Sequence, residues 1–424
     1  MNTSITRPLY ESALLCLAAP DPNRDAEIEA GWSNDAAYRR FLDVQPARPL
    51  SRAQIQKRYE AAQSRDSNEI LLAVRTQADD RLIGFARFYG IVWSRNYAQF
   101  RYAMGDPTAQ DDATTRELLQ LVLRYAFDEL GFYRLMVDVA SDEIEIIRVL
   151  EATGFRLETR QRQAVHYHGR RWDLLAYGLL VDEWRQPEVA QASVTLDNQQ
   201  AERWRSDVLS MPRSTNGHAR TNDALTGQLV RLAAPDVERD APVMTTWARN
   251  SEFVRMLDAD PTQPWSLAGT RKELEEMASR ERPNSVHLMI CTLADDQAIG
   301  FISLGGINWV HGSAWVGIGI GDPAFWGKGY GTEAMQLLLR YAFDELNLWR
   351  VNLNVFEYNE RAVRSYIKTG FVVEGRARHM FMREGRRWDF IYMGILRDEW
   401  ARRQVDQAAV VSTLADLPGK ERVP

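Results

Sequence analysis

Three glycines at alternate positions form the strongest chemical feature of the sequence. Gly327, Gly329 and Gly331 stand in the run WGKGYGTEA, directly between a predicted strand and a long predicted helix. Without side chains in the way, backbone N–H groups can approach an anion closely. The start of the following helix adds unpaired donors and the positive end of its dipole. The loop therefore predicts a cradle for a pyrophosphate.

The spacing of this loop separates it from two common phosphate-binding patterns. It has neither the GxxxxGK[ST] spacing of a Walker loop nor the GxGxxG spacing of a dinucleotide site. Taken alone, a glycine-rich turn is equally typical of a plain tight turn. The residues that follow the helix decide between these two interpretations.

A second pair of polar residues lies downstream, on a predicted helix over 360–369. Asn359 precedes this helix, and Tyr366 follows seven residues later. Seven residues make two helical turns, so both side chains lie on one face. A phenol on that face can donate a proton to a departing thiolate. The alternative is that Tyr366 is a core aromatic beside Ala362 and Val363.

The two motifs together resemble the GNAT N-acetyltransferase superfamily. They are WGKGYGTEA before a helix and, after a strand, NERAVRSYIKTGFVVEG. The nearest branch is the one that includes ribosomal-protein alanine N-acetyltransferases, and the resemblance covers the whole second half of the chain. It implies acetyl-CoA as co-substrate and direct transfer of an acetyl group to a primary amine in a ternary complex, without a metal.

The resemblance also implies which residues contact the co-substrate. The family pattern Arg/Gln-x-x-Gly-x-Gly/Ala maps onto Trp326–Gly331, with Trp in place of Arg or Gln. Asn359 matches the residue that bonds the pantetheine arm, and Tyr366 the residue at the CoA sulfur. The backbone near 318–320 matches a splayed strand that pairs with pantetheine and polarises the thioester carbonyl. The full implied set is Ile318, Gly319, Ile320, Trp326, Gly327, Lys328, Gly329, Tyr330, Gly331, Thr332, Asn359, Ala362, Ser365 and Tyr366.

The general base has no clear match to the family. Many relatives carry Glu early on the central strand, where this chain has Trp315. His311, just before that strand, is a substitute candidate because histidine titrates near neutrality; its other interpretation is an exposed loop histidine. Trp309 and Trp315 are expected either to wall the acceptor pocket or only to pack.

An internal repeat sets the domain organisation. The string YAFDEL occurs at 125–130 and at 341–346, an offset of 341 − 125 = 216. The same offset relates GRRWD at 169–173 to GRRWD at 385–389, which is too long a register for chance. We expect a first domain at 1–187, a polar linker at 188–225, a second domain at 226–403 and a polar tail at 404–424.

The elements expected in each copy give an α/β fold, more specifically an α+β domain with a mixed sheet and helices on its faces. The fold class is thus two tandem GNAT-like acyl-CoA N-acyltransferase domains. In the second copy we expect strands at 227–233, 286–293, 298–304, 314–320 and 351–355, helices at 243–257, 270–279, 332–346 and 360–369, and a final hairpin turning at Glu384-Gly385.

The first copy lacks the chemical residues of the second. The offset places Asp111 opposite Gly327, Glu143 opposite Asn359 and Leu150 opposite Tyr366. A carboxylate and added Cβ atoms both oppose pyrophosphate binding. We expect the first copy to be a degenerate GNAT-like domain without a CoA site, with the active site in the second.

The net charge, the apolar runs and the cysteine and histidine content limit which other functions are expected. A net charge of -6 with interspersed signs gives no reason to expect nucleic-acid binding. No apolar run approaches a membrane span, the start lacks a signal-peptide pattern, and Cys16 and Cys291 stand in apolar runs, which favours a cytoplasmic protein. His166 and His168 have no matching ligands, so we expect no metal site.

Two alternatives are left open both for the acceptor and for the function. The acceptor is expected to be a small-molecule amine or a protein N-terminus, and a homo-oligomer is left open. The absent carboxylate base supports a second hypothesis, a non-catalytic acyl-CoA-binding sensor or scaffold.

Overall fold

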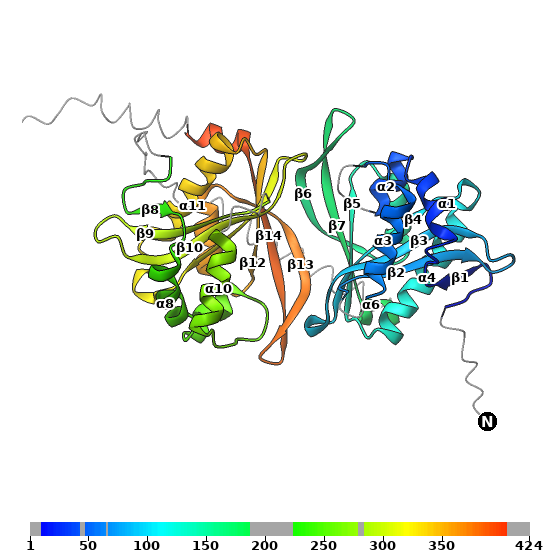
Figure 1. The fold of residues 1–424 in the computed structure, drawn as a ribbon, viewed down its shortest axis with the longest axis horizontal. Helices are drawn as coiled ribbons and strands as arrows, with labels where there is room; N and C mark the ends of the chain where they lie inside the picture. The colour runs from blue at the N-terminus through cyan, green and yellow to red at the C-terminus, as the bar shows by residue number, and fades with distance from the viewer. Residues whose placement is uncertain (1–9, 43–46, 65–66, 187–223, 279–283, 405–424) are drawn as a thin grey trace, which may run out of the picture. The chain divides into compact units, whose positions relative to one another are not determined.

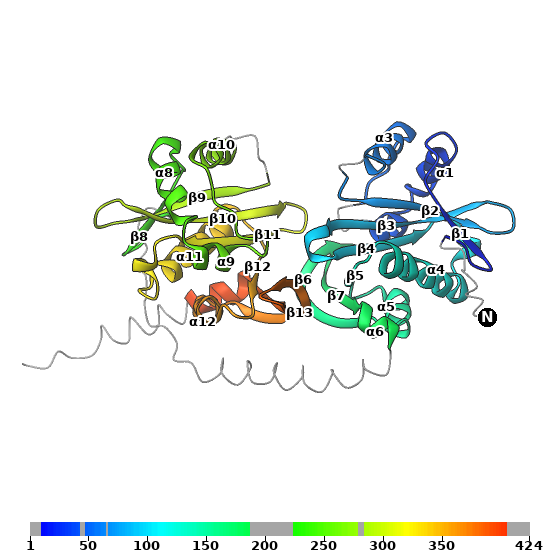
Figure 2. The same cartoon turned by 90° about the horizontal axis from the view of Figure 1, so that it is seen from below.

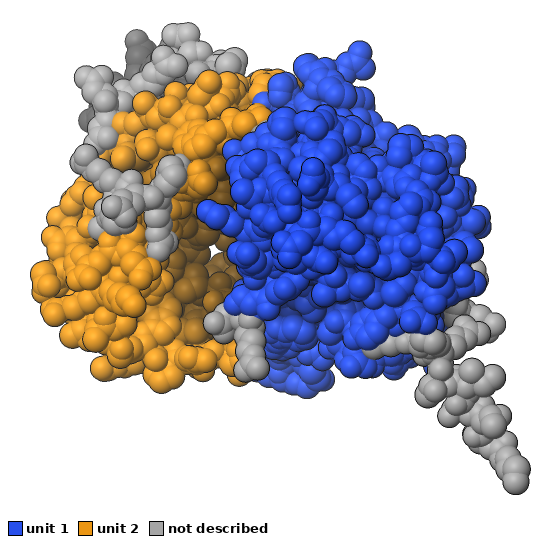
Figure 3. Space-filling view, turned by 45° about the vertical axis from the view of Figure 1, so that its right-hand side comes forward, with its two compact units in different colours: residues 1–200, 377–387 blue, residues 201–376, 388–424 orange. Residues whose placement is uncertain are grey.

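The computed structural model of the protein describes residues 10–42, 47–64, 67–186, 224–278 and 284–404. The chain divides into two compact units, residues 1–200 with 377–387 and residues 201–376 with 388–424 (Figure 3). The linker expected at 188–225 and the tail expected at 404–424 fall almost wholly outside the described residues.

The first copy alternates strands and helices in the expected order (Figure 1). Its main elements are β1 (Leu15–Ala18), α1 (Asp25–Trp32), α2 (Ala36–Leu42), α3 (Arg52–Ala62), β2 (Ile70–Thr76), β3 (Leu82–Val92), β4 (Tyr97–Met104), α4 (Asp112–Arg124), β5 (Arg134–Ala140), α5 (Ile144–Ala152), β6 (Arg156–Tyr167), β7 (Arg170–Leu180) and α6 (Val181–Arg185). The strands stand in the order β1-β2-β3-β4-β5-β7-β6.

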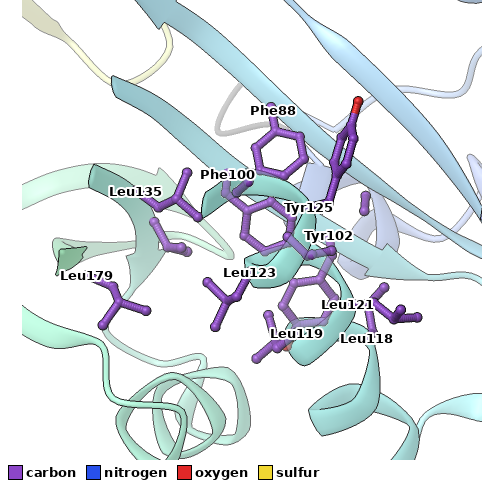
Figure 4. Packing of buried hydrophobic residues seen from close by; sticks show 14 of the residues in the cluster. Phe88, Phe100, Tyr102, Leu118, Leu119, Leu121, Leu123, Tyr125, Leu135 and Leu179 are labelled. Atoms are coloured by element: carbon purple, nitrogen blue, oxygen red, sulfur yellow. The ribbon is translucent and has the colours of Figure 1, made fainter. Parts of the chain in front are cut away.

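The core of the first copy forms where α4 crosses the sheet. Leu119 and Leu123 of α4 pack toward Phe88 of β3 and Phe100 of β4 (Figure 4). All four side chains are buried, because the apolar stripe of the helix recurs every three to four residues and the strands alternate. The repeated YAFDE segment continues α4 as a short π-helical turn, Tyr125–Glu129.

The second copy has the same topology. Its main elements are β8 (Val230–Ala233), α8 (Val237–Trp247), α9 (Ser251–Leu257), α10 (Leu267–Ala278), β9 (Val286–Thr292), β10 (Ala298–Asn308), β11 (Ser313–Ile320), α11 (Tyr330–Arg340), β12 (Arg350–Phe356), α12 (Glu360–Thr369), β13 (Val372–Arg383) and β14 (Arg386–Leu396). The order β8-β9-β10-β11-β12-β14-β13 reproduces that of the first copy. Only β11 and β12 pair in parallel among the described pairs of this copy, so the predicted mixed α/β sheet is confirmed.

Most expected elements of the second copy are present, with one clear error. The single helix predicted at 243–257 is wrong, because α8 ends at Trp247 and α9 begins at Ser251. Asn250 starts α9 by accepting hydrogen bonds from the amides of Glu252 (3.0 Å) and Phe253 (3.2 Å). This local cap competes with a continuous helix. The first strand also starts later than expected, at Val230, and the long helix starts earlier, at Tyr330.

Helices cover both faces of the second sheet (Figure 2). Buried side chains of α11 and α12 share one apolar core with Leu353 and Val355 of β12. Phe253 of α9 and Met244 of α8 share a separate core with Phe301 of β10. The sheet therefore separates an α11–α12 side from an α8–α10 side.

Candidate functional site

The central strands of the second sheet part in the middle of the domain. β11 and β12 pair only at Ser313–Arg350, Ala314–Val351 and Trp315–Asn352, and no further pairing between them is described. Asn352 holds the closed end, since its Nδ2 donates to the carbonyl of Ala314 at 3.1 Å. Arg350 Nε donates to Asn352 Oδ1 at 2.6 Å. Beyond this clamp the backbone of β11 faces an opening instead of a neighbouring strand.

A cavity of about 430 Å³ occupies this opening. It is lined by β11 from Val316 onward, by the glycine-rich loop, by α9 and by α12. Successive residues of β11 point to opposite faces of the sheet, so the cavity is lined from both faces. Ile318 and Ile320 point to the α11–α12 side and pack on its core. A Cβ built on Gly319 would instead point at Phe253 of α9, 3.1 Å away. The parted strands thus bring both faces of the sheet to one cavity.

The glycine-rich loop presents a bare helix end to the cavity. Gly327 has φ +73 and Gly329 has φ +95, a backbone region that side chains oppose. Gly329 is the N-cap of α11 and offers no side chain to its first turn. An α-helix leaves its first N–H groups without intrahelical partners, so these amides can serve a bound anion. Gly331 has ordinary space around it and is not held by strain.

Trp326, at the first position of the loop, is fixed by two contacts. Its indole Nε1 donates to the carbonyl of Ile320 at 2.7 Å. The guanidinium of Arg361, from α12, lies 4.0 Å above the indole ring. Burial lowers the pKa of Arg361 from its ordinary value. The structure thus places a cation from α12 beside a loop position where the family pattern has Arg or Gln.

Two side-chain hydrogen bonds fix α12, one at its N-cap and one to α11. Asn359 Oδ1 accepts a hydrogen bond from the amide of Ala362 at 3.2 Å, which caps the helix and leaves Nδ2 as its donor group. The hydroxyls of Thr332 on α11 and Ser365 on α12 lie 2.8 Å apart. This hydrogen bond joins the first turn of α11 to the middle of α12, beside the cavity.

Tyr366 lines the cavity one turn before the end of α12. Its ring lies 6.1 Å from that of Phe371, a contact that anchors the aromatic body. Burial raises the pKa of Tyr366 to about 12. The phenol therefore stays protonated at neutral pH and can act as a hydrogen-bond or proton donor.

The structure gathers most of the predicted site residues in one place. The predicted co-substrate residues that line the cavity are Ile318, Gly319, Ile320, Trp326, Gly327, Gly329, Gly331, Thr332, Asn359, Ala362, Ser365 and Tyr366. Lys328 and Tyr330 are not among the lining residues. Tyr330 packs edge-on against Phe325, with ring centroids 5.3 Å apart.

The predicted base and acceptor residues lie outside this lining. His311 is 6% exposed, so it is not the exposed loop histidine of the alternative interpretation, and its backbone N–H donates to Asn308. Trp309 is 53% exposed. Trp315 packs edge-on against Tyr392 at 5.8 Å. Roles for these residues in catalysis or acceptor binding stay predictions.

Other lining residues were not predicted from the sequence. They are chiefly Phe253, Met256 and Leu257 of α9, Phe356 and Phe390 of neighbouring strands, and Arg361, Arg364 and Lys368 of α12. The positive side chains of α12 could have been predicted, because helical spacing from Asn359 and Tyr366 places them near the same face of the helix. The sequence has no comparable signal for α9, because its approach depends on tertiary packing.

The first copy fills the equivalent positions with its own side chains. Asp111 caps α4, and its Oδ1 accepts from the amides of Ala113 and Thr114, each at 2.9 Å. Arg101, 6% exposed, stands where β11 has Gly317, and its Nε donates to Tyr89 Oη at 2.9 Å. Burial is the main cause that raises the pKa of Glu143 to about 7.

Two further searches of the described residues concern metals and membranes. No cluster of three or more His, Cys, Asp or Glu side chains able to hold a metal ion occurs in that part of the chain. None of the helices described there is both long and apolar enough to cross a membrane.

Comparison with known proteins addresses both copies. The model of the acetyltransferase (GNAT) domain matches residues 15–156 and 230–372. The chain is 38% identical over 106 residues to spermidine N(1)-acetyltransferase of Escherichia coli (strain K12), a match that covers 25% of this chain and 56% of that protein. It thus spans little more than half the length of that relative.

Two further relatives show the same likeness. The chain is 35% identical over 151 residues to YjcK of Bacillus subtilis (strain 168), named a probable N-acetyltransferase, covering 35% of this chain and 81% of that protein. A crystal structure of spermidine N-acetyltransferase from Vibrio cholerae in complex with CoA and spermine is 25% identical, covers 41% of this chain and 98% of its own, and has a TM-score of 0.37. With both of its copies matched by one family model, the chain belongs to the GNAT family of acyl-CoA-dependent N-acetyltransferases.

Proposed function

We propose that the second copy, at 226–403, transfers an acetyl group from acetyl-CoA to a primary amine. The observation that carries this proposal is the uncapped start of α11 at Gly329, which opens into the same cavity as the phenol of Tyr366. One end of the cavity thus suits a pyrophosphate and the other a leaving thiolate. Direct transfer in a ternary complex needs both groups in one cavity.

The lining residues suit the two charged parts of the co-substrate. The first amides of α11 face the pyrophosphate, while Arg361, Arg364 and Lys368 add positive charge along α12. Asn359 Nδ2 remains to donate to the pantetheine arm, because Oδ1 caps the helix. The unpaired backbone of β11 extends beside that arm as a strand would.

The chemistry requires three events at the thioester. The amine nitrogen bonds to the carbonyl carbon, the C–S bond breaks, and the sulfur leaves with its electron pair. A backbone N–H of β11 stabilises the carbonyl oxygen as charge develops there. Tyr366, held protonated, donates to the departing sulfur. The amine proton passes to water, since no carboxylate or imidazole occurs among the described lining residues.

The first copy serves as a structural or substrate-shaping partner in this proposal. Asp111 occupies the amides that a pyrophosphate would need, and Arg101 fills the position of Gly317. We propose a single CoA site per chain. Two bound CoA molecules of similar affinity would contradict this assignment.

A second candidate function is a non-catalytic acyl-CoA sensor or scaffold. The lack of a carboxylate or imidazole among the described lining residues favours it. The two functions differ in turnover, so the test is release of free thiol from acetyl-CoA with a broad set of amines and peptides. Thiol release in the presence of an amine supports the enzyme, while CoA binding without any thiol release supports the sensor.

The placement of the cofactor has its own test. Gly329→Asp adds a carboxylate and a strained side chain at φ +95. We expect CoA binding, measured by calorimetry, to weaken by about a hundredfold or more, because charge repulsion and strain together cost about 3 kcal/mol. Unchanged affinity would mean that the anchor of the cofactor lies elsewhere.

A further inference from the structure

The α8–α10 side of the cavity has a wall of apolar side chains. Phe253, Met256 and Leu257 of α9 contribute one part, and Phe356 of β12 and Phe390 of β14 the other. Phe356 and Phe390 are register partners, with ring centroids 5.3 Å apart. This wall lies across the sheet from α11 and α12, so it faces the cavity from the side opposite to the helices that hold the co-substrate in the proposed function.

The wall is fixed in place by contacts behind it. Tyr358 stacks on Phe356 with centroids 5.2 Å apart and planes 9° from parallel. Its hydroxyl donates to the carbonyl of Arg255 at 2.7 Å, which joins the end of β12 to α9. Trp388 packs edge-on against Tyr358 at 5.0 Å. The aromatic surface is therefore preformed, and little ordering cost falls on binding.

The charges of the cavity are all positive and lie on the other side. The charged residues among those that line it are Arg361, Arg364 and Lys368, all on α12. Four carboxylates lie next in sequence to the wall, and none of them is among the lining residues. Glu252 and Asp258 are exposed, and Glu252 interacts electrostatically with Arg361 of α12. The other two belong to an ion-pair network behind the wall. Glu357 and Asp389 accept from Arg376 Nη1 at 2.9 Å and 3.0 Å.

Asn354 is the neutral polar group that the lining offers on the same face of β12. It follows the two-residue alternation that also brings Phe356 to the wall. A neutral amide can accept one hydrogen bond from an ammonium but does not balance its charge. An acceptor with a second or third ammonium would have to bury it against phenyl rings without a counter-ion.

From this distribution of charge we infer that the acceptor is a primary monoamine with an apolar, aromatic-sized body, and that polyamines are poor acceptors. The inference rests on the proposed function of the same site. It separates this chain from the spermidine acetyltransferases to which it is similar. Burial of a phenyl-sized body against the wall stabilises the complex by roughly 25 cal/mol per Å² of apolar surface.

The direct test compares two amines with the full-length protein. Thiol release from acetyl-CoA is measured with 2-phenylethylamine and with spermidine at equal pH and ionic strength. We expect kcat/KM for 2-phenylethylamine to exceed that for spermidine by at least about tenfold. An equal or greater value for spermidine overturns the inference and leaves the acetyltransferase function standing.

A pair of variants tests the physical cause. Met256 is half-buried in the wall, so Met256→Glu adds a carboxylate there and Met256→Gln is its neutral match. We expect the Glu variant to raise the ratio of kcat/KM for spermidine over 2-phenylethylamine by about tenfold, as one charge-assisted hydrogen bond allows. The Gln variant should leave that ratio within about twofold. An equal ratio in both variants would show that charge at the wall does not select the acceptor.

The two proposals fail in different ways. If no amine or peptide releases thiol although CoA binds, the enzyme function falls and the acceptor class falls with it. If spermidine is acetylated as well as the aromatic amine, only the acceptor class is overturned.

Discussion

Asp111 Oδ1 accepts the amide of Thr114 at 2.9 Å, across the start of α4. The equivalent helix of the second copy starts at Gly329 with no side chain over its amides. Backbone and side-chain hydrogen bonds within the loop lower the pKa of Asp111, so the cap is a carboxylate at neutral pH. One copy thus caps its helix start with its own carboxylate, and the other leaves the first amides of the helix without a side-chain cap.

Placing the aspartate of the first copy in the loop of the second copy should weaken CoA binding there. Gly327→Asp places the carboxylate of the first copy over the amides of α11 and strains a backbone at φ +73. We expect the Kd of CoA to rise by about a hundredfold, because the anion loses its donors and meets a like charge. Isothermal titration measures it.

The matched control is Asp111→Gly at the same position of the first copy. It removes an N-cap and should lower stability by about 1 kcal/mol. The CoA affinity and the stoichiometry of one per chain should not change. A drop in affinity in this control would place part of the CoA site in the first copy.

Tyr366→Phe separates chemistry from binding. The variant keeps the ring that packs on Phe371 and removes only the hydroxyl. We expect kcat to fall by about a hundredfold through loss of a general acid, with the Kd of CoA changed less than about threefold. Thiol release and calorimetry measure the two quantities. Full activity of the variant would assign the proton donor to another group.

The pH dependence of kcat/KM should reflect ionisation of the acceptor amine and not of a group on the enzyme. The described lining holds no histidine or carboxylate, and the pKa of Tyr366 is raised to about 12, so its hydroxyl stays protonated below that range. For 2-phenylethylamine, log kcat/KM should rise by about one per pH unit from pH 6 to 9, because only the neutral amine attacks.

An acceptor of lower basicity provides the control for this profile. The amine of glycinamide resembles an α-amino group and titrates near pH 8, so its profile should level off at about that pH. A plateau near pH 6.5 with both amines would instead reveal a base of the enzyme, and His311 would be the first residue to replace.

Local sequence rules predict the parts of the fold that local forces determine. α12 begins at its Asn359 cap and ends at Gly370, which adopts φ +109, as the sequence indicates. The final hairpin turns at Glu384-Gly385, where both residues have positive φ. These features depend on neighbours a few residues away, and pattern reasoning reaches them.

The parts that sequence reasoning missed depend on distant contacts or on competing local bonds. The apolar run at 243–257 suits one helix, yet the Asn250 side chain starts a second one. That break brings Phe253 under Gly319, where a Cβ added to the glycine would lie 3.1 Å from the phenyl ring, and so forms the α9 part of the apolar wall. The stacking of Arg361 on Trp326 likewise joins two motifs whose separate patterns do not reveal the contact.

Buried charge at the closed end of the parted strands should dominate the stability of the second copy. Arg350 Nη2 donates to Glu374 Oε2 at 2.6 Å, and both side chains are almost fully buried. Arg350→Met removes this guanidinium from a buried carboxylate, so we expect the free energy of unfolding to fall by about 3–5 kcal/mol. Urea unfolding followed by circular dichroism measures this loss.

The double variant Arg350→Met with Glu374→Gln is the control for this pair. It removes both charges of the pair, and most of the lost stability should return, because an uncharged side chain costs less to bury. If the double variant is no more stable than Arg350→Met alone, the loss reflects packing around the Asn352 clamp instead of charge.

Glu143 makes the first copy sensitive to pH near neutrality. It occupies the position of Asn359, and burial is the main cause that raises its pKa to about 7. The folded state therefore binds this proton more tightly than the unfolded state, in which a glutamate titrates near 4.3. The resulting stabilisation is complete below about pH 4.3 and is lost as pH rises through about 7, amounting to about 3–4 kcal/mol.

Glu143→Gln should remove this dependence, because the amide stays neutral at every pH. We expect the variant to be more stable than the natural chain at pH 8 and nearly equal to it at pH 4, in urea unfolding that resolves the first copy. A stability difference for Glu143→Gln that is the same at pH 4 and pH 8 would show that folding does not shift the pKa of this carboxylate.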